Sequence, residues 1–127
     1  MIIGIGVDLV DIDRIAKLVE SKGDRALRRL FSDAEIAYAS RRALPAMHLA
    51  ARLAAKEATY KALAGNPLAR GIGWKDIEVA NGEDGQPTLV LHGSARARAD
   101  ELTVARLLLT MTHSTTTACA VVVAERD

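Results

Sequence analysis

Two stretches, Gly4-Ile5-Gly6-Val7-Asp8 and Ala51-Arg52-Leu53-Ala54-Ala55-Lys56-Glu57-Ala58-Thr59-Tyr60-Lys61, decide the fold of this chain. The first is typical of a strand that ends in an acid, and the second is typical of an alanine-rich helix. Together they place two carboxylates and three cations on rigid elements that are far apart in the sequence. Such an arrangement is suited to holding Mg²⁺ and a polyphosphate. The first hypothesis is therefore a metal-dependent phosphoryl-type transfer.

Outside these stretches, the sequence predicts further strands and helices. Ser32 followed by Glu35 is a capping-box signal for a short helix, and Gly65-Asn66-Pro67 is expected to stop the long one. The expected elements are strands over 2–9, 77–80, 88–91, 104–112 and 117–124, and helices over 12–19, 32–38, 45–63 and 94–102. This order predicts a single α+β domain over residues 1–127, with a small, mostly antiparallel sheet packed with helices.

Composition and charge narrow the class of protein. Half of the residues are hydrophobic, only one is a cysteine, and no segment approaches the roughly 20 apolar residues of a membrane span. We therefore expect a cytoplasmic protein that does not bind membranes. Residues 14–61 hold 11 Lys/Arg against 5 Asp/Glu, which favours an anionic ligand or an acidic protein partner. Nucleic acid is not expected, because aromatic residues are not interleaved with the basic ones.

Each candidate site residue also has an ordinary structural interpretation. Glu57 and Lys61, four apart, could form a surface ion pair worth about 0.3 to 0.5 kcal/mol. Asp8 could cap the following helix, although Asp11 could do this equally well. His113, expected at the end of a strand, could satisfy a turn. The many alanines of the long helix indicate close packing on several sides, which makes its charged residues harder to explain as solvated surface.

The whole chain resembles the holo-acyl-carrier-protein synthases, the short class of the 4′-phosphopantetheinyl transferases. The resemblance rests on four blocks that occur in the family's order and spacing. They are Gly4 to Val10 with Asp13-Arg14-Ile15, Arg52 to Ala58 with Lys61-Ala62, Asp76 to Val79 with Gly85-Gln86-Pro87, and Thr112-His113 before Ala118 to Glu125.

The resemblance implies transfer of the phosphopantetheine arm of coenzyme A to a serine of apo acyl carrier protein, with release of adenosine 3′,5′-bisphosphate, in fatty-acid biosynthesis. It implies that Asp8 and Glu57 hold Mg²⁺. Glu57 would accept the serine proton, directly or through a water on the metal, and Lys61 would neutralise phosphate oxygens or assist that transfer. Arg52, Lys56, Thr112 and His113 would help to hold the nucleotide and its 3′-phosphate.

Carrier proteins of this kind are acidic helical bundles, so the resemblance implies that Arg14, Arg25 and Arg28 dock them. It also implies a homotrimer in which His113 of one subunit approaches Asp8 and Glu57 of a neighbour. The chain departs from the family at Ala64-Gly65-Asn66, which replaces a usual Gly-Thr-Gly turn. Two alternatives remain open: the same chemistry dedicated to carrier domains of polyketide or fatty-acid synthase multienzymes, and a noncatalytic module that binds an acidic helical partner.

Overall fold

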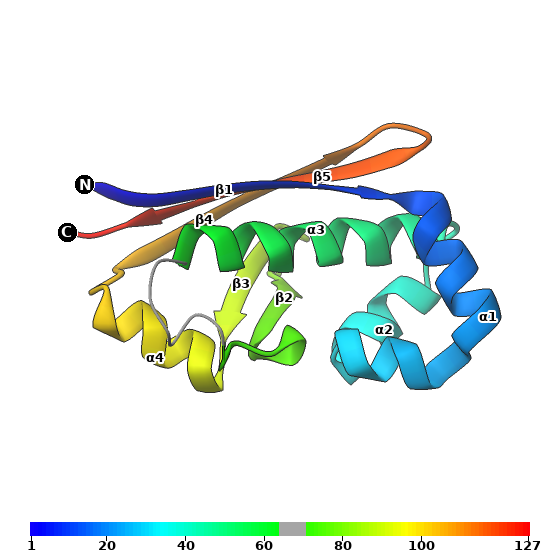
Figure 1. Cartoon of the computed structure of the whole chain (residues 1–127). Helices are drawn as coiled ribbons and strands as arrows, with labels where there is room; N and C mark the ends of the chain where they lie inside the picture. The colour runs from blue at the N-terminus through cyan, green and yellow to red at the C-terminus, as the bar shows by residue number, and fades with distance from the viewer. Residues whose placement is uncertain (64–70) are drawn as a thin grey trace.

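The described residues of the computed structural model, 1–63 and 71–127, build two antiparallel sheets and several helices around one long central helix (Figure 1). In chain order the elements are β1 (Ile2–Asp11), α1 (Ile12–Leu30), α2 (Asp33–Ser40), α3 (Pro45–Leu63), η2 (Trp74–Asp76), β2 (Ile77–Asn81), β3 (Pro87–Leu91), α4 (Gly93–Glu101), β4 (Arg106–His113) and β5 (Thr117–Glu125). The predicted α+β class with antiparallel pairing is confirmed.

The larger sheet has the strand order β1-β5-β4 and covers one side of α3 (Figure 1). The smaller sheet pairs β2 with β3 and lies on the other side of α3, as do α1, α2 and α4 (Figure 1). In β5, alternate residues from Ala118 to Ala124 are buried, because successive side chains of a strand point to opposite faces. The buried face of the sheet packs on α3, and no helix or strand of the described part of the chain covers the opposite face (Figure 1).

Helix α3 is enclosed on nearly all sides, as its alanine content predicts. Ala50, Ala54, Ala55 and Ala58 have no exposed surface. Small residues on β1 allow an equally close approach from the strand, because a Cβ built on Gly6 would collide with the carbonyl oxygen of Ala58. Gly4 meets Ala62 in the same way. The backbones of β1 and α3 are therefore in direct contact. This contact fixes the relative positions of the side chains that the two elements carry next to it.

The helices α1 and α2 follow the sequence signals with one addition. Ser32 caps α2 as predicted, since its Oγ accepts a hydrogen bond from the Glu35 backbone N–H at 3.2 Å. The Glu35 side chain in turn accepts one from the Ser32 backbone N–H at 2.9 Å, which completes the capping box. Helix α1 contains a kink at Gly23, whose φ of 66° suits only glycine well. The kink separates Arg14 from Arg25 and Arg28.

Some boundaries differ from the prediction. Strand β1 continues to Asp11, so Asp8 lies inside the strand and not at its end. Asp11 is the N-cap residue of α1 but makes no side-chain capping bond, and Asp8 does not cap the helix. The 3₁₀ turn η2 was not predicted.

The expected stop at Gly65-Asn66-Pro67 and the departure at Ala64-Gly65-Asn66 lie outside the described residues. No helix in the described part of the chain is long and apolar enough to cross a membrane.

Candidate active site

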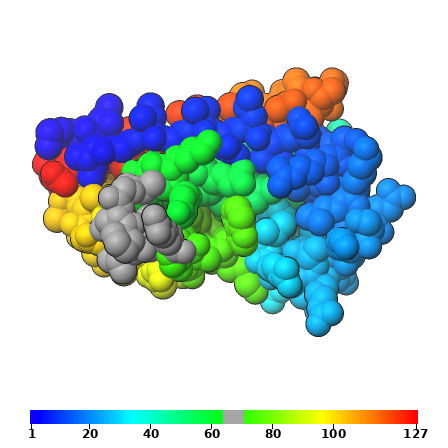
Figure 2. Space-filling model, viewed as in Figure 1, coloured from blue at the N-terminus to red at the C-terminus, as the bar shows by residue number. Residues whose placement is uncertain are grey.

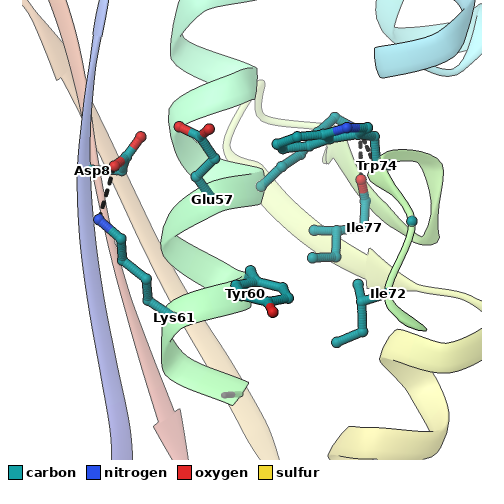
Figure 3. Close-up of a pocket in the computed structure, with 9 residues that line it drawn as sticks. Asp8, Glu57, Tyr60, Lys61, Ile72, Trp74 and Ile77 are labelled. Atoms are coloured by element: carbon teal, nitrogen blue, oxygen red, sulfur yellow. Dashed lines mark hydrogen bonds and ion pairs between the residues drawn. The ribbon is translucent and has the colours of Figure 1, made fainter. Parts of the chain in front are cut away.

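Asp8 and Lys61 meet where β1 runs alongside the C-terminal half of α3 (Figure 3). The Lys61 Nζ donates to Asp8 Oδ1 and to the Val7 carbonyl oxygen, both at 2.9 Å. The second carboxylate oxygen, Asp8 Oδ2, is buried and has no hydrogen-bond partner among the described residues. One oxygen of Asp8 is thus neutralised by a cation, while the other lacks a partner.

Glu57 brings a second carboxyl group to the same place, one turn before Lys61 on α3 (Figure 3). Burial, and then the neighbouring Asp8, raise the pKa of Glu57 to about 7. Burial alone would also raise the pKa of Asp8, but Glu57 and Lys61 outweigh burial and hold that pKa below its ordinary value. The two carboxyls therefore cannot both ionise easily near neutral pH unless a positive charge lies between them.

This donor set fits a magnesium ion. Asp8 and Glu57 supply two hard oxygen donors, and the unsatisfied Asp8 Oδ2 is a buried acceptor that a cation would satisfy. Among residues 1–63 and 71–127, no group of three or more His, Cys, Asp or Glu side chains is close enough to hold a metal. A site with two carboxylates suits Mg²⁺, which keeps several waters, better than it suits zinc.

The carboxyls open into a cavity of about 460 Å³ with an apolar wall (Figure 3). We call this cavity the acidic pocket. Its lining consists of Asp8, Lys56, Glu57, Tyr60, Lys61, Ile72, Gly73, Trp74 and Ile77. The wall formed by Tyr60, Ile72, Trp74 and Ile77 was not predicted from the sequence. The only tryptophan of the chain was the one signal that could have drawn attention to it.

Three of the predicted nucleotide-binding residues lie together in a different cavity. Arg52, Thr112 and His113 line a cavity of about 250 Å³, and none of the described residues lines both this cavity and the acidic pocket. We call it the basic pocket. Among the described residues, its lining consists of Tyr38, Met47, His48, Ala51, Arg52, Asn81, Gly85, Pro87, Met111, Thr112 and His113. Within one chain, the structure therefore does not bring His113 to Asp8 and Glu57.

The basic pocket is built around the ring of Tyr38. The guanidinium carbons of Arg42 and Arg52 lie 4.2 and 4.1 Å from the ring centroid. Arg52 also donates to Asn81 Oδ1 at 2.9 Å, while its Nε is buried without a partner among the described residues. Burial, and then Arg52, Arg42 and His113, lower the pKa of His48. Since none of the described residues that line the cavity is an acid, its charge favours an anion.

Lys56 does not present its ammonium to solvent. Its side chain has no exposed surface, and its Nζ lies 2.8 Å from Glu35 Oε1. Burial lowers the pKa of Lys56, and Glu35 counters this effect. Lys56 therefore borders the acidic pocket as part of an internal ion pair.

The predicted docking arginines lie on the exposed surface of α1. Arg14 lines a groove of about 250 Å³ between α1 and α3 that also includes Glu57 and Trp74. We call this the α1 groove. Arg25 and Arg28 follow the Gly23 kink, and Arg28 borders a separate small cleft against α2. Of the three arginines, Arg14 is the one that the structure places beside the acidic pocket.

The raised pKa of Glu57 predicts how stability depends on pH without divalent metal. The folded chain holds the Glu57 proton more tightly than the unfolded chain, since its pKa rises from 4.5 to about 7 on folding. The associated stabilisation is complete below about pH 4.5 and is lost as the pH rises through about 7. Glu57→Gln should therefore raise Tm relative to the unmodified protein more at pH 8 than at pH 5.

Thermal unfolding in EDTA at both pH values measures this difference. Glu83→Gln, in the exposed turn between β2 and β3, is the matched control and should show no such pH dependence. An equal effect of Glu57→Gln on Tm at the two pH values would contradict the raised pKa.

Comparisons with known proteins give consistent relatives. The family model described as the 4′-phosphopantetheinyl transferase superfamily matches residues 4–122. The curated holo-[acyl-carrier-protein] synthase of Solibacter usitatus is 44% identical over 125 residues, which are 98% of this chain and 99% of that protein. The crystal structure of the Neisseria meningitidis synthase has a TM-score of 0.85 at 29% identity, covering 99% of this chain and 100% of that one. The Helicobacter pylori synthase in complex with coenzyme A has a TM-score of 0.79 at 28% identity, covering 95% and 99%.

Proposed function

The chain belongs to the 4′-phosphopantetheinyl transferase superfamily, among the holo-[acyl-carrier-protein] synthases, and we propose that its acidic pocket carries out this transfer from coenzyme A with Mg²⁺. The observation that carries the proposal is the meeting of Asp8, Glu57 and Lys61 beside a cavity large enough for part of such a substrate. A transfer to an alcohol needs a proton acceptor and positive charge at the phosphates, and these residues supply both.

In the proposed reaction, the serine oxygen of the carrier protein attacks the phosphorus next to the pantetheine arm. A bond forms between that oxygen and phosphorus, and the phosphorus–oxygen bond to the other phosphate breaks. Adenosine 3′,5′-bisphosphate leaves with the electron pair of the broken bond. Glu57 accepts the serine proton, because its carboxyl group lies in the acidic pocket beside Asp8, where the serine must approach the phosphates. Lys61 stays charged, because Asp8 raises its pKa, and it stabilises phosphate oxygens.

Asp8 and Glu57 are the residues that would hold Mg²⁺. When bound, the ion supplies positive charge to pyrophosphate oxygens on which negative charge builds during transfer. The Lys61–Asp8 contact keeps the Asp8 carboxylate ionised and oriented before the ion arrives. The chain's own contribution is thus an arranged pair of carboxylates with a cation at one side.

We propose that the chain assembles as a homotrimer that brings a basic pocket of one protomer to the acidic pocket of the next. The uncovered face of the larger sheet supports this, because Ile5, Val7 and Leu9 of β1 are 67%, 53% and 65% exposed. Figure 2 shows β1 along the edge of the molecule, next to α3. Leu108 of β4 adds a further exposed apolar side chain to this sheet. A soluble protein seldom leaves such a face bare.

In this assembly Arg52, Thr112 and His113 would hold the nucleotide and its 3′-phosphate, while the pyrophosphate reaches Asp8, Glu57 and Lys61 of the neighbour. Light scattering should give a mass of about three times 13.6 kDa. A monomer that transfers at full rate would contradict the shared site.

We propose that Arg14, with Arg25 and Arg28, docks the acidic carrier protein. Arg14→Ala should raise the KM for the carrier by roughly two- to fivefold, the size of one exposed charge contact, and should weaken its dependence on salt. The KM for coenzyme A should stay unchanged. Steady-state kinetics at two salt concentrations measures both effects. Arg96→Ala, on α4 at the far end of the molecule (Figure 1), is the control. An unchanged carrier KM for Arg14→Ala would remove Arg14 from docking.

The experiment that tests the proposed function mixes the protein with coenzyme A, Mg²⁺ and an apo carrier, and weighs the carrier by intact mass spectrometry. We expect the mass of a phosphopantetheine group on the free acyl carrier protein, which would agree with an enzyme of fatty-acid biosynthesis. Modification of carrier domains of multienzymes alone would support the dedicated alternative. A carrier that gains no mass under any of these conditions would refute the proposal.

A further inference from the structure

Glu35 and Lys56 form a fully buried ion pair outside the set of reacting groups. Both side chains have no exposed surface, and the two charged groups are 2.8 Å apart. We infer that this pair is a positioning device that holds the Trp74–Ile77 segment against α3, where that segment forms the wall between the acidic pocket and the α1 groove. The inference rests on the proposed function, because it concerns how the transferase site is kept in shape.

The carboxylate of Glu35 joins three elements. Its Oε1 accepts from the Ser32 backbone N–H at 2.9 Å, at the start of α2, and from Lys56 on α3. Its Oε2 accepts from the Val79 backbone N–H in β2 at 3.0 Å. Each contact engages the charged form of the side chain, so the three elements are held at fixed separations. Glu35 lines neither the acidic pocket nor the α1 groove.

The ammonium of Lys56 is fully engaged. Besides Glu35, it donates to the Trp74 carbonyl at 2.9 Å and to the Ile77 carbonyl at 2.5 Å. An ammonium has three protons, and these acceptors account for all of them. Lys56 therefore has no proton left for a phosphate oxygen, and its neighbourhood explains its buried position without a ligand.

The segment that Lys56 holds lies at the junction of the two proposed substrate sites. Trp74 and Glu57 line both the acidic pocket and the α1 groove. The Trp74 residue is 40% exposed, and its ring lies on the opposite side of the acidic pocket from Asp8 (Figure 3). Under the proposed function, the phosphates of coenzyme A lie in the acidic pocket and the carrier docks at the α1 groove, so this wall borders both substrates. A shift of the wall therefore changes how the two substrates meet more than how either one binds.

The test compares Lys56→Met and Glu35→Gln in the transfer assay and by Trp74 fluorescence. Each variant should lower kcat by about 10- to 100-fold, the loss typical of a small misplacement of reacting groups, with little change in the KM for coenzyme A. Acrylamide should quench Trp74 more strongly in both variants, since the wall becomes looser. Trp74 is the only tryptophan, so the fluorescence reports on this wall alone. Asp100→Asn, which removes an exposed ion pair with Arg96 on α4, should change neither readout.

A variant that leaves one buried charge unpaired can fail to fold, so the double variant Glu35→Gln with Lys56→Met is made as well. The double variant has no unpaired buried charge, but it still lacks the Lys56 ammonium that donates to the Trp74 and Ile77 carbonyls. We therefore expect it to show the same lower kcat and stronger quenching as the single variants. A large rise in the KM for coenzyme A in Lys56→Met, with Glu35→Gln unaffected, would overturn the inference in favour of a phosphate ligand. Wild-type kcat and quenching in the double variant would overturn it too.

The fluorescence arm is independent of the reaction. If the unmodified protein transferred nothing, the proposed function would fail. Stronger quenching in both single variants would still show that the Glu35–Lys56 pair holds the Trp74 wall in place. If the wild-type protein is active and the variants match it in kcat and in quenching, the proposed function stands and the positioning role of the Glu35–Lys56 pair is rejected.

Discussion

Asp8→Asn should lower kcat for phosphopantetheine transfer by about 10³-fold while leaving the protein folded, a loss comparable to removal of a main electrostatic group from an active site. Asparagine keeps the size of the side chain and one oxygen that can accept from Lys61. It loses the charge that Asp8 Oδ2 would offer to Mg²⁺, and this oxygen has no other partner among the described residues. The expected loss of kcat therefore comes from the missing negative charge and not from a change in packing.

Transfer rates at saturating substrates, measured over a series of Mg²⁺ concentrations, test this expectation, and Tm measures folding separately. Asp11→Asn is the matched control, because Asp11 is an exposed acid on the same strand that makes no capping bond. Asp11→Asn should retain wild-type kcat. Near-full turnover of Asp8→Asn at saturating substrate would remove Asp8 from the site.

Much of the fold could be predicted because its signals are local. The capping box at Ser32 and Glu35 requires no knowledge of distant residues, and the bounds of α3, Pro45–Leu63, match the prediction. The pairing of β2 with β3 follows from a turn-forming cluster between two short apolar runs. The end of β1 could not be read, because its last residues pair with Thr117 and Ala118 of β5, more than 100 positions away.

The candidate site was predictable only in part, for the same physical reason. Asp8, Glu57 and Lys61 stand in motifs, and the structure brings them together. The predicted site residues line two separate cavities, the acidic and the basic pocket, because of how distant parts of the chain pack. The spacing of these residues in the sequence does not predict this separation. Glu35 is a further example: its capping signal was recognised, but its contact with Lys56 joins α2 to α3 and has no sequence signature.

Gly6→Ala is the second substitution with a large expected effect, although it changes no charged or polar side chain. The added methyl group would collide with the backbone carbonyl oxygen of Ala58, and a helix carbonyl cannot move aside as a flexible side chain could. We expect the free energy of unfolding to fall by about 3 kcal/mol, the upper part of the usual range for overpacking. For a chain of this length, that loss corresponds to a Tm lower by about 10 °C.

The functional loss should exceed what unfolding explains, because β1 can accept the methyl group only by moving away from α3. Asp8 follows Gly6 by two residues on β1, so that movement would also carry Asp8 away from Glu57. We therefore expect kcat, measured well below Tm, to fall by about 100-fold. Circular dichroism establishes that the variant is folded at the assay temperature. Gly71→Ala is the matched control, since a methyl group there meets only Ser94 Oγ at 3.8 Å. A Gly6→Ala protein with wild-type Tm and kcat would mean that the contact of β1 with α3 does not set the geometry of the carboxylate pair.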